Sequence, residues 1–271
     1  MTHPGRRRGH RCCLALVVFG FTWVSRSAVA ESSGDTLTAD AIVAKVLERN
    51  ALGFDNAVAR LQLVTRTKNG GDKSRVVEVR SLRRGVQGKT LARFLSPGEV
   101  AGTAFLVLEN RDRDDDQYLY LPALGKVKRI TVTQRQQRFM GTELTYADLE
   151  SANLRRANLT RLADQSVAAQ PTFVVEARPR EPKESDYARS VAYVHQTAFV
   201  PVRVEFFDKA NVLLKVLTVA KLEQRAGRWV ATDTSVKNVQ TQGVTRLVVE
   251  VLDLVTIPDE REFTEQALLG G

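Results

Sequence analysis

"AVARLQLVTRTKNGGDKSRVVEVRSLRR", residues 57–84, is the stretch that predicts the fold class of this chain. Apolar and polar residues alternate on both sides of Asn69-Gly70-Gly71, as they do in strands that bury one face. Asn and Gly tolerate the positive φ angles that a tight hairpin turn requires. The stretch is therefore predicted to form a β-hairpin with one buried face.

The same alternation continues along most of the chain. In "PVRVEFF", residues 201–207, Val202, Val204 and Phe206 share one face,. Further strands are expected near residues 89–95, 103–109, 117–121, 127–133, 172–179, 187–195, 200–207, 212–222, 228–237 and 244–254. Because no regular alternation of strands with helices is visible, we expect one antiparallel sheet, rolled or doubled over.

Few segments have helical spacing. A helix is expected to start at Thr38 or Asp40 and to end near Gly53, and two more helical pieces are expected around residues 143–163 and 261–269,. A long sheet with one apolar face must close tightly on its own side chains or leave a concave apolar hollow that helices partly cover. The residue pattern leaves both arrangements open.

Residues 1–30 have the three parts of a secretory signal peptide. A basic start is followed by a short apolar run from Cys12 to Ser25 and by the cleavage pattern Ala28-Val29-Ala30. The apolar run is shorter than the roughly 20 residues that a membrane-spanning helix needs. We therefore expect an exported protein whose residues 31–271 form a single domain.

Removal of residues 1–30 would change the chemistry of the chain. Five arginines lie there, so the net charge of +9 falls to +4. Both cysteines and two of the three histidines lie there as well, which leaves His195 as the last histidine. We therefore expect no disulfide, no cysteine-based metal site and no thiol nucleophile. Nucleic acid is not an expected partner of an exported chain.

The run "DRDDD", residues 112–116, has the spacing of the first three ligands of a calcium-binding EF-hand loop. The glycine that such a loop needs at its sixth position is replaced by Gln117, and the glutamate at its twelfth position by Ala123,. The run is therefore interpreted as a solvated hairpin turn, and no metal site is predicted.

Two other features were candidates for a special function. "ADLESANLRRANLTR", residues 147–161, resembles three pentapeptide repeats, which are too few to stack into a β-helix, so an amphipathic helix or a loop is expected,. His195 has no serine-containing elbow and no second histidine as partner, and is expected to be structural. None of the common hydrolase, metalloprotease, dinucleotide or P-loop motifs occurs. We expect no catalytic residues and no cofactor.

Basic residues concentrate around Lys126, Lys128 and Arg129, with Arg135 and Arg138 further on. Their alternation with apolar residues predicts a strand at an edge of the sheet with its cations directed outward. The cations could protect an exposed edge and keep the protein soluble. They could also contact an anionic membrane surface or an acidic partner.

Three segments carry a resemblance to a known family. They are "PGEVAGTAFL" (residues 97–106), "DDQYLYLPALGKVKRI" (115–130) and "RFMGTELTYADLE" (138–150). In this order they resemble the LolA-like outer-membrane lipoprotein-sorting proteins, with Glu143 where a typical member has aspartate. The resemblance extends over essentially all of residues 31–271, to Trp229 and to Phe263 with Leu268.

The resemblance implies a mainly β (α+β) fold: a curved antiparallel sheet that forms an unclosed half-barrel, with a few helices over an apolar cavity. Phe139, Met140, Leu144 and Tyr146 would form a loop and helix over this cavity, and would either fill the core or contact a ligand. The expected ligand-binding residues are Phe94, Phe105, Tyr118, Tyr120, Phe139, Met140, Leu144 and Tyr146.

The implied function is non-enzymatic. The protein would be a periplasmic carrier that binds the acyl chains of a lipoprotein, or another lipid, on the way to the outer membrane. The alternative is an accessory periplasmic subunit of a lipid-exporting transporter of the resistance-nodulation-division (RND) type. In either case Lys126, Lys128 and Arg129 would contact the membrane or a partner, and we expect the protein to be a monomer.

Overall fold

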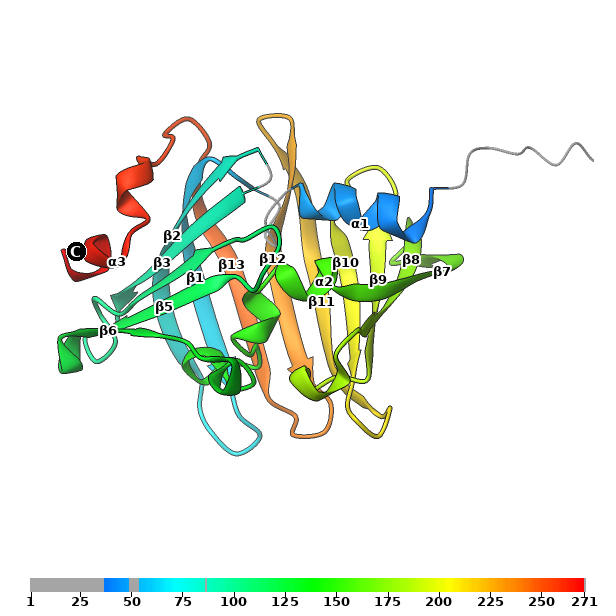
Figure 1. The fold of residues 1–271 in the computed structure, drawn as a ribbon, viewed down its shortest axis with the longest axis horizontal. Helices are drawn as coiled ribbons and strands as arrows, with labels where there is room; N and C mark the ends of the chain where they lie inside the picture. The colour runs from blue at the N-terminus through cyan, green and yellow to red at the C-terminus, as the bar shows by residue number, and fades with distance from the viewer. Residues whose placement is uncertain (1–36, 49–53, 86, 271) are drawn as a thin grey trace, which may run out of the picture. The chain divides into compact units, whose positions relative to one another are not determined.

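An antiparallel sheet of thirteen strands dominates the part of the chain that the structure, a computed structural model, describes: residues 37–48, 54–85 and 87–270 (Figure 1). The strands are β1 (Ala57–Arg66), β2 (Lys73–Arg84), β3 (Gln87–Ser96), β4 (Ala104–Leu108), β5 (Asp116–Leu121), β6 (Lys126–Arg129), β7 (Ala157–Val167), β8 (Gln170–Pro179), β9 (Arg189–His195), β10 (Pro201–Phe207), β11 (Leu213–Arg225), β12 (Arg228–Asn238) and β13 (Val244–Asp253). The expected signal peptide and the expected helix end at Gly53 lie outside the described residues. That residues 31–271 form a single domain stays a prediction.

The strand order shows that the sheet is open. It runs β6-β5-β4-β3-β2-β1-β13-β12-β11-β10-β9-β8-β7, so each half of the chain is a meander and the two halves meet where β1 pairs with β13. Strands β6 and β7 form the two edges and do not pair with each other. The predicted unclosed half-barrel is confirmed.

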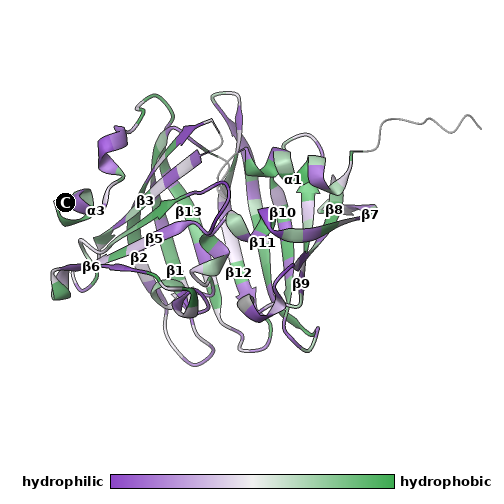
Figure 2. Cartoon of the chain, viewed as in Figure 1, coloured by the Kyte–Doolittle hydropathy of each residue, from purple (hydrophilic) through white to green (hydrophobic). Residues whose placement is uncertain are grey.

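The hairpin predicted from residues 57–84 is β1 and β2. Val64 lies opposite Ser74, and the turn between the strands contains Asn69 and Gly70. Along β1 the residues at alternate positions from Ala57 to Leu63 are buried. Figure 2 shows the same alternation of hydrophobic and hydrophilic residues along several strands. The period of two therefore decides which face of the sheet is buried.

Short helices accompany the sheet. In the described residues they are α1 (Ala39–Leu47), α2 (Ala152–Arg155) and α3 (Glu265–Leu269), with 3-10 turns at η1 (Pro122–Leu124), η2 (Val132–Gln134), η3 (Phe139–Gly141), η4 (Ala147–Leu149), η5 (Pro182–Glu184) and η6 (Glu260–Glu262). The Thr38 side chain caps α1 by accepting a hydrogen bond from the backbone N–H of Ala41 (3.1 Å), as expected,. Among the described residues, no helix is both long enough and apolar enough to cross a membrane.

Residues 130–156 connect the two edges of the sheet, from the end of β6 to the start of β7. We call them the crossover segment. The long helix expected at residues 143–163 is wrong, because α2 has only four residues and Ala157–Val167 is the edge strand β7. β7 is held by its pairing with β8, in which Leu159 lies opposite Ala177. β8 follows β7 directly in a hairpin, in which Val167 lies opposite Gln170, so strand pairing overrides the helical spacing that suggested the helix.

The two faces of the sheet carry different apolar clusters. On the concave face, residues of β1–β5 and β13 pack with Phe139 and Tyr146 of the crossover segment, and α1 packs against β8 and β9. On the convex face, Leu268 of α3 and Phe263 pack against β2–β5. The concave cluster is thus covered by the crossover segment, whereas α3 covers the opposite face.

Candidate functional site

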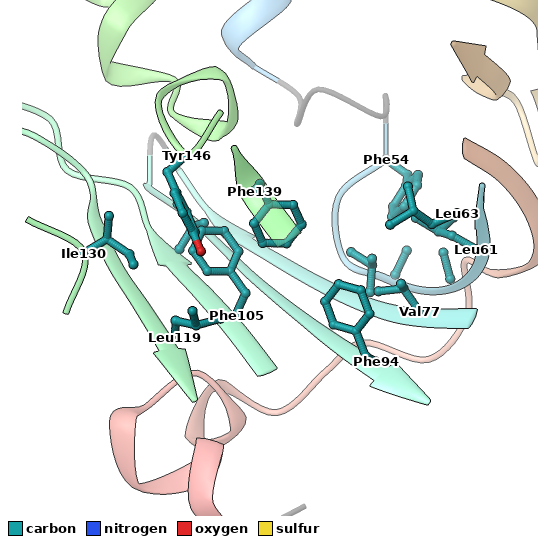
Figure 3. Packing of buried hydrophobic residues seen from close by; sticks show 14 of the residues in the cluster. Phe54, Leu61, Leu63, Val77, Phe94, Phe105, Leu119, Ile130, Phe139 and Tyr146 are labelled. Carbon is teal, nitrogen blue, oxygen red and sulfur yellow. The ribbon is translucent and has the colours of Figure 1, made fainter. Parts of the chain in front are cut away.

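Four aromatic rings form the centre of the concave cluster (Figure 3). Phe94 and Phe105 come from β3 and β4, and Phe139 and Tyr146 come from the crossover segment above them. The ring centroids of Phe105 and Phe139 are 4.9 Å apart, and Phe139 meets Tyr146 edge to face at 5.6 Å. Such tilted contacts are favoured between aromatic rings. The crossover segment is therefore attached to the concave face through apolar side chains.

A tight loop presents Phe139 to the sheet. Met140 and Gly141 both have positive φ angles, of 47° and 74°, so the backbone reverses directly after Phe139. The backbone N–H of Phe139 donates to the carbonyl of Leu144 (2.7 Å), and the Thr142 hydroxyl donates to the carbonyl of Phe139 (2.7 Å). The "FMGT" sequence thus forms a tight turn that directs the Phe139 ring toward the concave face.

A buried ion pair fastens the crossover segment to β11. The Nζ of Lys215 donates to the carboxylate of Asp148 and to the backbone carbonyl of Glu143 (3.0 Å). The Tyr187 hydroxyl donates to the same carboxylate (2.9 Å). Burial raises the pKa of this hydroxyl, and the charge of Asp148 raises it further, so Tyr187 remains a donor. We call Lys215, Asp148 and Tyr187 the latch.

The start of β13 and the turn before it make a second attachment. The backbone N–H of Glu143 donates to the Thr245 hydroxyl (2.8 Å), and the Glu143 carboxylate pairs with Arg138 at 3.1 Å. A Cβ atom on Gly243 would lie 2.0 Å from Oε1 of Glu143. Glycine at position 243 is therefore needed for the buried Glu143 side chain to lie against this turn.

The end of the crossover segment is attached to the β4–β5 turn. The carboxylate of Asp115, which is 1% exposed, accepts hydrogen bonds from the backbone N–H groups of Ser151 (3.0 Å) and Ala152 (3.3 Å) and pairs with Arg155 at 2.8 Å. The expectation that "DRDDD" is a fully solvated turn is therefore wrong for Asp115 and Asp116, because arginines neutralise both side chains in buried positions. No cluster of potential metal ligands occurs among the described residues.

Known proteins share this architecture. A family model described as that of an uncharacterized protein matches residues 87–269. An outer-membrane lipoprotein-sorting protein domain from Vibrio parahaemolyticus is 32% identical, with a TM-score of 0.77 over 86% of this chain and 98% of that one. This chain belongs to the LolA-like outer-membrane lipoprotein-sorting family.

Two other solved structures support the LolA-like fold alone. A DUF1329 family protein from Desulfovibrio piger has a TM-score of 0.76 at 23% identity, covering 86% of this chain and all of that one. A LolA superfamily protein from Nitrosomonas europaea has a TM-score of 0.62 at 18% identity, covering 85% of this chain and 99% of that one. No protein of curated function matches the chain.

The LolA-like sheet brings together most of the residues predicted to bind a ligand. Phe94, Phe105, Phe139 and Tyr146 are buried in one cluster, and Met140 packs against it. Leu144 is half-buried in the loop that follows Phe139.

The other two residues of that prediction lie elsewhere. Tyr118 and Tyr120 pack on the convex face with Phe263 and Leu268. Leu119, between them, faces the concave cluster instead, where it lies opposite Phe105. That any of the eight residues contacts a ligand stays a prediction.

The basic residues lie where the sequence predicted. β6 is an edge strand of the LolA-like sheet, Lys126 and Lys128 are exposed, and Arg129 pairs with Asp116. Their contact with a membrane or partner stays a prediction. His195 ends β9, where its Nδ1 accepts hydrogen bonds from the backbone N–H groups of Thr197 (3.2 Å) and Ala198 (3.1 Å), so it stabilises a turn.

Sequence reasoning missed the latch. Lys215 occupies an inward position of β11, where it interrupts an otherwise apolar pattern. This interruption could have indicated a buried lysine that needs an acidic partner. Its partner Asp148 is 67 residues away in the chain. No sequence pattern marked Gly243 and Thr245 as functional residues, because their role depends on contact with Glu143, which lies beside them only in the folded protein.

Glu150 should make the stability of this LolA-like chain depend on pH. Burial raises the pKa of Glu150 from its usual 4.5 to about 7, although Arg135 opposes this increase. The folded state then binds a proton more tightly than the unfolded state, so this group stabilises the fold at low pH and loses that contribution between pH 4.5 and 7. Glu150→Gln should therefore gain stability relative to the wild type as the pH rises from 5 to 8. Urea unfolding at both pH values would test this, and parallel profiles would contradict it.

Proposed function

We propose that this protein is a non-enzymatic periplasmic carrier that binds the acyl chains of a lipoprotein or another lipid. The acyl chains would lie on the concave face of the sheet, beneath the crossover segment. The observation that carries this proposal is the way in which the concave cluster is covered. Its cover is a segment that contributes no strand to the sheet and is attached by apolar side chains, the latch and individual hydrogen bonds, so lifting it would leave the strand pairing intact.

The chemistry of the cluster suits an acyl chain. Among the described residues, fifteen buried side chains form it, and the four rings at its centre could move apart with the crossover segment. Each CH₂ group removed from water contributes about 0.8 kcal/mol. An acyl chain could therefore replace Phe139 and Tyr146 as the cover of the sheet and offset the cost of lifting them.

The relative from Vibrio parahaemolyticus supports the same role, because it is described as an outer-membrane lipoprotein-sorting protein domain. An accessory subunit of an RND-type transporter is the second candidate. The observation that favours it is the exposure of Lys126 and Lys128 on the edge strand β6, where they could contact a partner. The two roles differ in whether the bound state requires a membrane protein.

Native mass spectrometry of residues 31–271, purified from a periplasm, should detect a stoichiometric acyl-bearing adduct. Phe105→Ser should remove the adduct, because it places a hydroxyl in the concave cluster. Leu106→Ser is the matched control, since Leu106 is equally buried on the same strand but faces the convex cluster. It should keep the adduct.

A bare mass that does not change after incubation with lipids would overturn the carrier proposal. Equal loss of the adduct in both variants would show that the concave face is not the binding site. Pull-down from detergent-solubilised membranes would address the second candidate, because an accessory subunit should retain its membrane partner in Phe105→Ser.

A further inference from the structure

A cavity separate from the ring cluster lies at one edge of the sheet. Its volume is about 570 Å³. It is bounded by the β4–β5 turn, the end of β6 and the crossover segment. Four arginines line it: Arg113, Arg129, Arg135 and Arg156. So many guanidinium groups around one cavity suggest an anionic ligand, because this group recognises phosphates and carboxylates with two parallel hydrogen bonds.

The nearby carboxylates do not occupy all the N–H donors of these arginines. Asp114 is shared by Arg135 and Arg156, and Asp116 is shared by Arg113 and Arg129. Arg135 also pairs with Glu150 at 2.9 Å and donates to the backbone carbonyl of Asp115 (3.3 Å). Each guanidinium has five N–H donors, so donors remain after these partners have been bound. The hydrogen bond from Arg113 holds the pKa of Asp116 well below its usual range, with smaller contributions from its other partners.

The excess positive charge at the cavity comes from lysines beside it. The four arginines are balanced by four carboxylates, those of Asp112, Asp114, Asp116 and Glu150, the last of which pairs with Arg135 at 2.9 Å. Lys126 and Lys128 are exposed on the adjacent strand β6 and add to the positive potential there. An anion in the cavity would therefore be stabilised by direct contacts and by the field around them.

Ile130 connects this cavity with the apolar cluster. It lines the cavity, and it is also a buried member of the concave cluster, with 6% of its surface exposed. A charged group in the cavity would thus be separated from the acyl region by little more than one side chain. This arrangement suits a ligand that has an anionic group next to an apolar chain.

We propose that the cavity lined by Arg113, Arg129, Arg135 and Arg156 binds the phosphate group of an anionic lipid. This inference rests on the proposed function and adds the chemical class of the ligand's polar end. The acyl chains would lie beneath the crossover segment while the phosphate contacts the arginines beside Ile130. Free inorganic phosphate presents the same chemistry to the arginines, so the test must separate the two sources.

The test compares three probes by isothermal titration calorimetry: dihexanoyl phosphatidylglycerol, dihexanoylglycerol and inorganic phosphate. The two lipids have the same acyl chains and differ only in the phosphoglycerol group. Each charge-assisted hydrogen bond contributes about tenfold in affinity, so two such contacts should make the phospholipid bind about 100-fold more tightly than dihexanoylglycerol.

The double variant R129Q/R156Q should remove this difference and leave the affinity for dihexanoylglycerol unchanged. Arg129 and Arg156 are 61% and 44% exposed, and Asp116 and Asp114 keep Arg113 and Arg135 as partners, so the fold should be retained. R225Q is the matched control, because Arg225 is a similarly exposed arginine paired with Glu223 outside the cavity lining. It should bind all three probes like the wild type.

Equal affinities of the wild type for the two lipids would overturn the inference while leaving acyl binding intact. An unchanged preference for the phospholipid in R129Q/R156Q would overturn it as well. If neither lipid binds, the proposed function fails. In that case, binding of inorganic phosphate that is lost in R129Q/R156Q would show that the cavity is a site for free anions and would overturn its assignment to a lipid.

Discussion

Lys215→Met should lower the free energy of unfolding by about 3–5 kcal/mol, because removing one member of a buried ion pair leaves the other charge without compensation. Lys215 is 2% exposed and the Asp148 side chain 3% exposed. Asp148 would keep the Tyr187 hydroxyl as a donor but would lose its only cationic partner within the described residues. Urea unfolding at pH 7 would measure the loss.

Two further variants make this experiment specific. Lys221→Met changes a lysine of the same strand that is exposed, and it should alter the free energy of unfolding by less than about 0.5 kcal/mol,. Adding Asp148→Asn to Lys215→Met removes the uncompensated charge and should recover part of the loss. Equal stabilities of Lys215→Met and Lys221→Met would show that the latch does not stabilise the crossover segment.

A disulfide between positions 143 and 243 should abolish acyl binding, because it would prevent the crossover segment from lifting. A Cβ atom at Gly243 would lie 3.4 Å from Cγ of Glu143. In Glu143→Cys the Sγ atom would take the place of this Cγ, so it would lie within reach of a cysteine Sγ at position 243 for an S–S bond of about 2 Å. The φ angle of Gly243 lies outside the left-handed region, so a cysteine can adopt it. Residues 31–271 contain no other cysteine that could compete.

The double-cysteine variant is its own control. Reduction with dithiothreitol should restore binding of the phospholipid to the level seen for the Glu143→Cys single variant. Binding by the oxidised and the reduced protein would be measured as the change in fluorescence when the phospholipid displaces a fluorescent acyl probe. If the oxidised protein binds lipid as well as the reduced protein does, the crossover segment does not need to move, and the acyl chains must bind elsewhere.

Local patterns predicted most of the sheet. The hairpin of β1 and β2, the edge position of β6 and the cap at Thr38 depend on residues that are close in the chain, so alternation and turn chemistry were sufficient. The helix expected at residues 143–163 was wrong because pairing with β8 overrides the local preference of residues 157–163.

The site was predictable only in part. Phe139 and Tyr146 were correctly placed over the concave face from the family signature. Tyr118 and Tyr120 were expected there too, but the register of β5 against β4 puts Leu119 on that face. Because one residue of register exchanges the two faces of a strand, such an assignment requires the pairing partner. The latch could not be predicted for the same reason, because its residues are distant in the sequence and meet only in the folded chain.

The position of β1 beside β13 has a consequence for the order in which the chain can fold. β1 comes before β2–β12 in the chain, but one of its two neighbours, β13 (Val244–Asp253), comes after them. Before these two strands pair, β1 is an edge strand with unpaired backbone groups, which are prone to pair with other chains. Joining strands so far apart in sequence is also slow. The half of the sheet that contains β1–β6 therefore has an unpaired edge until β13 pairs with β1. A partner that protects this edge would raise the yield of folded protein.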